Sequence, residues 1–221
     1  MVLLTLVPIY FQAIKGSTPT DSGLQLLPLM LSLVIMSFIV GGLVTWWGYY
    51  TPFIIFGSAL FTVGCGLMTT FTVDQAAWRA YGLTIVAGAG CGFALQNAYM
   101  SVQAVLPQST LPIGNAAVMF SQTLSGAVFL AVCQSVLSNG LVTQIEQRIP
   151  DLDPSMIINA GATGIRNIVT AAQLPIVLEA YNVAVRNVFI MAAALAGCSF
   201  IAACGFEWKS IKGKNLAAGM A

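Results

Sequence analysis

The sequence has very few charged residues and no histidine at all. Charged side chains make up 7% of its 221 residues, whereas a typical soluble domain has about 25%. So few charges would not cover the surface of a soluble protein of this size. The lack of histidine removes the commonest general base and metal ligand. We therefore expect no metal centre, no cofactor and no enzymatic activity.

The few charges are also unevenly distributed. No Asp, Glu, Lys or Arg occurs in residues 22–73, 80–145 or 187–206. A charge at the centre of a bilayer costs about 2.5–3.5 kcal/mol on insertion scales, so such long uncharged runs are typical of membrane-embedded sequence. The net charge is +1 and there is no basic patch of the kind that nucleic-acid binders carry. The sequence predicts an integral membrane protein with the lipid bilayer, and no nucleic acid, as its partner.

Apolar runs predict six spans, at residues 1–14, 24–45, 53–71, 81–106, 113–137 and 175–206. The first span has about 14 residues and would rise only about 21 Å as a helix, short of a hydrocarbon core of ~30 Å. We therefore expect a truncated first helix. Together the spans predict an all-α membrane domain over residues 1–206.

The connection at residues 138–174 is too polar to span and is predicted to be an outer loop. Within it, Asp153 and Pro154 are typical of a helix cap followed by proline at the first position. The apolar spacing of Ile165, Ile168 and Val169 predicts a short amphipathic helix after Thr163, lying on the membrane surface.

Residues 207–221 follow the last span and hold Lys209, Lys212 and Lys214. Basic residues next to a span favour the cytoplasmic side. We therefore predict a cytoplasmic tail, which places the loop at residues 138–174 on the outer side.

The uncharged span at residues 81–106 carries the main candidate site. At about 100° per residue, Gly88, Gly92, Gln96, Tyr99 and Gln103 fall on one face. Small residues let membrane helices approach closely, so the two glycines are predicted packing positions. Two interpretations of the polar residues stay open. They bind a substrate in a central cavity, or they hydrogen-bond neighbouring helices.

Span 113–137 holds a second polar group, because Ser121, Gln122 and Ser125 share a face. These residues are further candidate substrate contacts. The alternative, which we favour for the serines, is a hydrogen bond from each hydroxyl to a carbonyl of its own helix. The one acidic residue in the predicted spans is Glu179, in the first turns of the last span, which is longer than the bilayer and should project there into water. The membrane-embedded parts of the spans therefore contain no group for a proton relay.

Several connected segments of the sequence resemble the C-terminal half of the major facilitator superfamily. They are PIYFQAIKGSTPTDSGLQLLPLMLSLV, GGLVTWWGYYTPF, GAGCGFALQNAYMSVQAVLP and FEWKSIKGKN. More narrowly, the chain is similar to the fungal fourteen-span drug:proton antiporters, the group of the aflatoxin and HC-toxin efflux carriers. The resemblance implies a six-helix bundle of two three-helix repeats, which forms one transporter half in the plasma membrane. In the family, an N-terminal half that is absent from this sequence completes the protein.

The resemblance also extends to a short cytoplasmic loop of the family. Gly42 and Gly48 match the family's glycines, which the resemblance assigns to packing, but Trp46 stands where the family has Arg. The predicted function is the efflux of small lipophilic compounds or toxins as part of a two-half transporter. The alternative is a non-transporting membrane remnant or scaffold that associates with other spans through its glycine faces.

Overall fold

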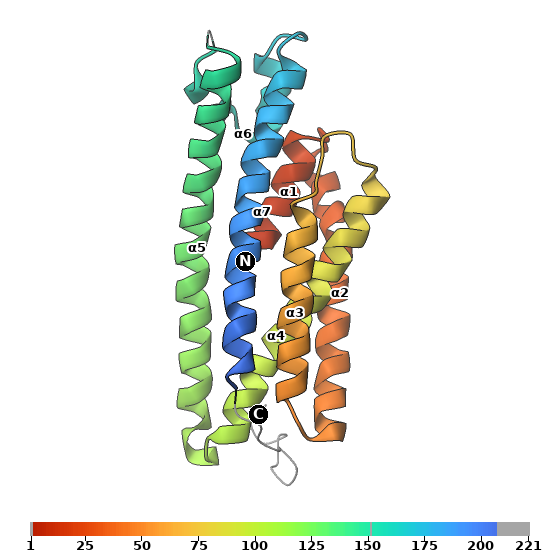
Figure 1. Ribbon diagram of the computed structural model, residues 1–221, viewed down its shortest axis with the longest axis vertical. Coiled ribbons are helices and arrows are strands. Elements are labelled where there is room, and N and C mark those ends of the chain that lie inside the picture. Colours follow the sequence, from red (N-terminus) through yellow and green to blue (C-terminus); the bar gives the residue numbers. More distant parts are fainter. Residues whose placement is uncertain (1, 151, 207–221) are drawn as a thin grey trace. The chain divides into compact units, whose positions relative to one another are not determined.

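The computed structural model describes residues 2–150 and 152–206, and its regular elements within these ranges are helices (Figure 1). They are α1 (Val2–Ala13), α2 (Pro19–Trp47), α3 (Thr51–Met68), α4 (Ala77–Val105), the 3-10 helix η1 (Gln108–Thr110), α5 (Leu111–Arg148), α6 (Pro154–Ile168) and α7 (Leu174–Cys204). The all-α membrane fold predicted from the sequence is confirmed. The predicted cytoplasmic tail, residues 207–221, lies outside the described residues.

Each predicted span corresponds to a helix, although the boundaries differ. Four helical stretches of the described chain are long and apolar enough to cross a membrane: Pro19–Trp47, Thr51–Met68, Gln108–Arg148 and Leu174–Cys204. Helix α4 is as long as α2, with 29 residues. It is not among the four, because its carboxamides and glycines lower its hydropathy. Its passage through the membrane stays a prediction.

Helix α5 continues to Arg148, where the sequence predicts an outer loop from residue 138. The polar side chains after Leu137 were the reason to end the span there. The buried residues Cys133, Leu137, Leu141 and Ile145 nevertheless repeat every four positions, which keeps one apolar stripe against the protein while polar groups occupy other faces. The predicted loop is therefore helical in its first part.

Helix α6 begins at Pro154, earlier than the predicted start after Thr163. Asp153 is its N-cap, since the backbone N–H of Ser155 donates to the Asp153 carboxylate at 2.9 Å. That hydrogen bond favours the charged carboxylate and holds the pKa of Asp153 below its ordinary value. Gly161 interrupts the helix with φ 65° and ψ −177°. The second piece of α6 therefore begins close to the predicted start.

The chain folds into two compact units. Among the described residues, unit 1 comprises residues 2–27, 66–82 and 126–192 without 151, and unit 2 comprises residues 28–65, 83–125 and 193–206. Helices α2, α3, α4, α5 and α7 each contribute a stretch to both units.

Side-chain donors from three parts of unit 1 hold the connection between α3 and α4. The Lys15 ammonium donates to two carbonyl oxygens of this connection, at 2.6 and 2.7 Å. The hydroxyl of Tyr10, which is fully buried, donates to a third at 2.8 Å, and the Asn182 amide donates to a fourth at 3.2 Å. The four accepting residues are Phe71, Thr72, Val73 and Gln75.

Helix α6 is joined to the turn between α1 and α2 through Arg166. Its guanidinium donates to the Ile14 carbonyl at 3.1 Å and lies against Gly16, where an added Cβ would come within 2.6 Å of Nε. Gly16 has φ +70°, a conformation that glycine adopts without a steric penalty. A larger residue here would therefore disturb both the turn and the arginine.

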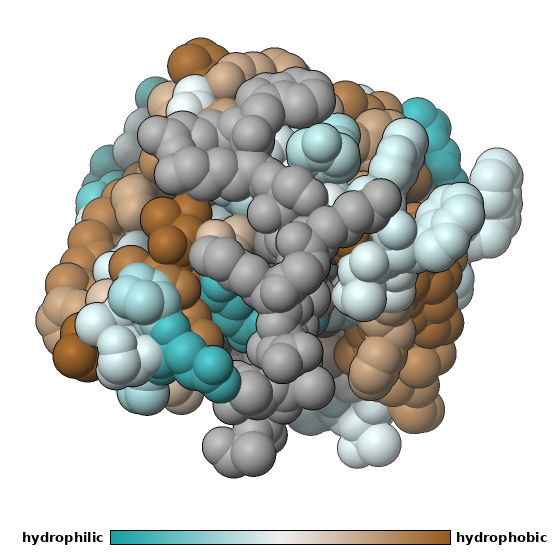
Figure 2. Space-filling view, turned by 90° about the horizontal axis from the view of Figure 1, so that it is seen from below, coloured by the Kyte–Doolittle hydropathy of each residue, from teal (hydrophilic) through white to brown (hydrophobic). Residues whose placement is uncertain are grey.

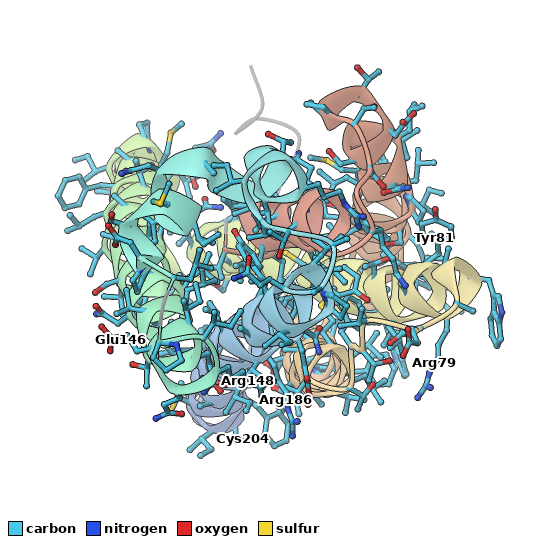
Figure 3. All side chains as sticks on the ribbon, turned by 90° about the horizontal axis from the view of Figure 1, so that it is seen from above. Arg79, Tyr81, Glu146, Arg148, Arg186 and Cys204 are labelled. Atoms are coloured by element: carbon cyan, nitrogen blue, oxygen red, sulfur yellow. The ribbon has the colours of Figure 1, made fainter. Side chains whose placement is uncertain are left out.

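Helices α5 and α7 lie side by side in unit 1. An added Cβ at Gly140 of α5 would be 3.5 Å from the Ala184 Cβ of α7. Arg148, at the end of α5, points toward α7 (Figure 3) and forms an ion pair of 2.8 Å with Glu179. Because the Glu179 side chain is 62% exposed, this pair adds little stability.

Unit 2 has its own apolar core and an apolar surface. The fully buried Val40, Val44 and Tyr50 pack with residues of α3, α4 and α7. On the outside, Phe38 is 79% exposed and Ile201 is 73% exposed, and brown apolar residues make up much of the surface in Figure 2. A water-soluble protein rarely exposes so much apolar surface, but hydrocarbon solvates it well.

Candidate functional site

Helix α4 is seated against α2 and α3 by its glycines. A Cβ added at Gly88 would overlap the Leu29 carbonyl oxygen of α2, and one at Gly92 would overlap the Leu33 carbonyl oxygen. Gly90, on the opposite side, lies against the backbone of Phe61 in α3. Only residues without a side chain allow backbones this close. The glycine end of the α4 stripe therefore faces α2 and is closed by it.

The polar end of the stripe begins with Gln96, which is half-buried and bonded to α2. The hydroxyl of Ser37 donates to Gln96 Oε1 at 3.2 Å. Gly41, one turn further along α2, leaves room for the carboxamide, since a Cβ there would be 3.7 Å from Gln96 Nε2. The Gln96 amide group makes no hydrogen bond to another described residue. Gln96 is thus held by its oxygen and keeps two N–H donors.

Tyr99 and Gln122 form the second polar pair, which joins α4 to α5. The Tyr99 hydroxyl donates to Gln122 Oε1 at 3.1 Å, and both residues are half-buried. The Gln122 amide group, like that of Gln96, has no partner within residues 2–150 and 152–206. Gln103 is half-buried too, and its carboxamide makes no hydrogen bond in the same ranges. Three carboxamides of unit 2 thus retain donors.

The two serines of α5 differ from the glutamine between them. Ser121 and Ser125 are both exposed. The Ser125 hydroxyl donates to the Ser121 carbonyl at 2.6 Å and to the Gln122 carbonyl at 3.2 Å. Ser125 thus makes the bond to its own helix that we favoured for both serines, whereas the Ser121 hydroxyl makes no hydrogen bond within the described residues. The Ser125 hydroxyl proton is therefore already engaged.

The two family-matched glycines differ in their surroundings. At Gly42 an added Cβ would meet no heavy atom of the described residues within 4 Å, so the packing role of Gly42 stays a prediction. The neighbouring Gly41 faces α4 instead, because one residue along a helix turns the Cα by about 100°. Gly48 lies in the turn between α2 and α3 with φ +84°, which gives it a conformational role. Trp46, at the end of α2, is 80% exposed.

Asn97 is a fully buried polar residue of α4 next to Gln96, and it bonds to its own helix. Its amide donates to the Phe93 carbonyl at 2.8 Å, whereas its side-chain oxygen is sealed from solvent without a partner. Asn97 makes no hydrogen bond to a neighbouring helix within the described residues.

The site contains no charge and no metal-binding group. Within the described parts of the chain, no three His, Cys, Asp or Glu side chains are placed to hold a metal ion. What unit 2 offers chemically is a set of neutral N–H donors on largely apolar helices. Such donors bind carbonyl, hydroxyl or ether oxygens. The partner that sequence reasoning missed is Ser37, although its spacing of four from Gly41 was a detectable signal.

An all-helical chain with apolar surface, close glycine contacts and neutral polar pairs belongs to the class of multi-span membrane proteins. No protein-family model matches the chain. It is similar to the MFS-type efflux pump MFS1 of Trichophyton rubrum, with 41% identity over 215 residues, 97% of this chain and 40% of that protein. It is also similar to the efflux pump aflT of Aspergillus parasiticus, with 38% identity over 212 residues, 96% of this chain and 41% of that protein. The efflux pump roqT of Penicillium rubens is 38% identical over 211 residues, 96% of this chain and 39% of that protein.

The chain belongs to the major facilitator superfamily, as the sequence segments predicted. It spans about two fifths of the length of the curated relatives it matches. These relatives are named as transporters or efflux pumps and not as enzymes.

Proposed function

We propose that this chain is one part of a transporter that exports small, largely apolar compounds. The observation that carries the proposal is the 38–41% identity to fungal efflux pumps over nearly the whole chain. Because the chain matches only about 40% of each relative, we assign transport to a complete protein in which an N-terminal portion accompanies these helices. We place that protein in the plasma membrane, where export removes a compound from the cell.

The carboxamides of unit 2 are the proposed substrate contacts. Gln96 and Gln122 are each held through their oxygen, by Ser37 and Tyr99, so that their N–H groups are oriented without further ordering. Prior orientation lowers the entropic cost of binding. Gln103 adds a third carboxamide, which lies on the same face of α4 as Gln96. This arrangement supports neutral, oxygen-bearing lipophilic substrates.

Helix α5 supports the need for a further portion of the protein. In the most apolar stretch of Gln108–Arg148, which includes α5, only 6% of the residues are buried, whereas 39% are buried in the corresponding stretch of α3. Phe120 is 67% exposed and Met119 is 64% exposed. We propose that the N-terminal portion covers part of this surface and that substrate passes between the two. Residues 22–73, 80–145 and 187–206 contain no Asp or Glu, so any carboxylate for proton coupling would come from that portion.

A fusion protein tests the proposal directly. The chain is joined in frame behind the N-terminal portion of the Trichophyton rubrum relative and produced in a pump-deficient yeast strain. We expect export of Nile red, a neutral lipophilic dye with a carbonyl oxygen, from preloaded cells. The double variant Gln96→Leu with Gln103→Leu should lower the export rate about thirtyfold at equal surface expression, because loss of about 1 kcal/mol is expected for each of the two hydrogen bonds.

Gln147→Leu is the matched control, because Gln147 is exposed and lies outside the site. It should export at the rate of the unchanged fusion. Equal rates in all three proteins would remove the carboxamides from the substrate path. A correctly inserted fusion without any export would favour the alternative, a non-transporting membrane scaffold.

A further inference from the structure

Unit 1 contains a cavity that is separate from the carboxamides of unit 2. It has a volume of about 140 Å³ and is lined by residues of α1, α5, α6 and α7. Ile9 of α1 and Ile157 of α6 contribute apolar walls, and Ile157 is only 1% exposed. No charged side chain lines this space. It is therefore suited to a neutral ligand.

Three polar side chains border the cavity and make no hydrogen bond within the described residues: Tyr181 is buried, Ser138 is half-buried and Gln134 is exposed. Tyr181 of α7 is 7% exposed, yet its hydroxyl makes no hydrogen bond to any residue of the described ranges. The same holds for the Ser138 hydroxyl and the Gln134 carboxamide of α5. By contrast, Ser58 and Ser125 both donate to carbonyls of their own helices.

An unused polar group in a buried place costs about 1–3 kcal/mol. A protein therefore gains when a ligand or a water molecule supplies the partner. Tyr181 meets this description most closely, because it is the buried one of the three polar residues that line the cavity. An acyl chain would leave the hydroxyl unsatisfied, whereas a molecule with an oxygen acceptor or donor would not.

The kink in α6 forms part of the cavity wall. Gly161 lines it with φ +65°, and a Cβ added there would have no heavy atom within 4 Å. Ala162 follows and also lines the cavity with only a methyl side chain. Two small residues in succession leave space where a continuous helix with larger side chains would fill it.

We infer that this cavity binds one ring of a small neutral molecule that carries a hydroxyl or carbonyl group, a phenol being the simplest member of the class. The volume supports a single ring, because a protein cavity of about 150 Å³ holds benzene. The inference concerns binding and does not depend on transport by the complete protein.

The test uses the full chain in lipid nanodiscs with 4-fluorophenol as the probe and ¹⁹F NMR as the readout. We expect saturable binding above the signal of empty nanodiscs. Fluorobenzene, which lacks the hydroxyl, should bind about fivefold more weakly, as expected for one net hydrogen bond of about 1 kcal/mol. Tyr181→Phe should weaken the binding of 4-fluorophenol by a similar factor and leave the binding of fluorobenzene unchanged.

Filling the cavity should abolish saturable binding. Ala162→Phe fills the cavity from α6, and Ser138→Leu fills it from α5. If one variant fails to fold, the other still tests the inference. Thr163→Phe is the matched control, because Thr163 is exposed and does not line the cavity; it should bind like the unchanged chain.

Two results would overturn the inference. One is binding that persists in both filled variants, which would locate the probe elsewhere. The other is equal affinity for fluorobenzene and 4-fluorophenol together with no effect of Tyr181→Phe, which would make the cavity a slot for lipid chains.

Discussion

At the scale of single residues, the glycines of α4 determine how closely this helix approaches its neighbours. Gly88 and Gly92 meet backbone carbonyls of α2, and Gly90 meets the backbone of α3. Gly82, near the start of the same helix, has no heavy atom within 4 Å of an added Cβ. One helix thus contains both kinds of glycine, which permits a matched comparison.

Replacing these glycines by alanine should have opposite effects on stability. Gly92→Ala places a Cβ against the Leu33 carbonyl oxygen and should destabilise the chain by about 1–3 kcal/mol through overpacking. Gly82→Ala has open space and should be neutral or stabilising by up to about 1 kcal/mol, because alanine favours helix. Thermal unfolding in detergent, followed by helical circular dichroism, measures both. Equal melting temperatures would show that the backbone contact at Gly92 is absent in solution.

At the scale of elements, the connection between α3 and α4 depends on distant side chains. Lys15 supplies two charge-assisted hydrogen bonds to it, and Tyr10 and Asn182 supply one each. Phe71, at the start of the connection, is buried against the rings of Tyr10 and Phe189, whereas these hydrogen bonds hold the backbone that follows. Its local stability should therefore follow these donors rather than the helices that it joins.

Lys15→Met should loosen this connection without unfolding the chain. Hydrogen bonds to a charged group contribute about 1.5–3 kcal/mol each, so amide hydrogen exchange in residues 69–76 should accelerate about tenfold or more. Arg79→Met is the control, because Arg79 is an exposed cation whose side chain makes no hydrogen bond to another described residue. Exchange that is equally fast in both variants would mean that general charge, and not the Lys15 contacts, protects the connection.

At the scale of the whole molecule, α5 is the helix with the least support from the rest of the chain. The part of α5 that belongs to unit 1 packs against the rest of that unit through the buried stripe that includes Leu137, Leu141 and Ile145. Many other large apolar residues of α5 are exposed, including Ile113 at 71%. Such a surface is stable in lipid and is also available to another protein portion.

A tryptophan at Phe120 of α5 should report what covers this helix. In nanodiscs with brominated lipid, Phe120→Trp fluorescence should be quenched in the chain alone and protected severalfold in the fusion with the N-terminal portion. Val63→Trp on α3 is the control, because Val63 is 55% exposed and lies outside the proposed interface. It should be quenched in both proteins. Undiminished quenching at residue 120 in the fusion would contradict the proposed interface.

The sequence by itself determined the membrane class, the number and order of the helices, the α6 cap and the family. These features depend on local physics: uncharged runs, helix length and capping chemistry act within one segment. It also identified the residues of α4 that carry polar groups, since a helix converts spacing directly into faces. It placed the end of α5 too early, because polarity does not end a helix whose buried stripe continues.

Only the tertiary structure decided which group each polar residue meets. That Gln96 bonds Ser37, that Tyr99 bonds Gln122 and that Gly41 rather than Gly42 faces α4 depend on the rotation of one helix against another. The cavity beside Tyr181 is lined by three consecutive helices, α5, α6 and α7, and by α1 from the other end of the chain, and no local pattern encodes such a space. Helix rotation and cavity shape result from the packing of many side chains at once, and the sequence of one segment does not contain the contacts that the other segments make with it.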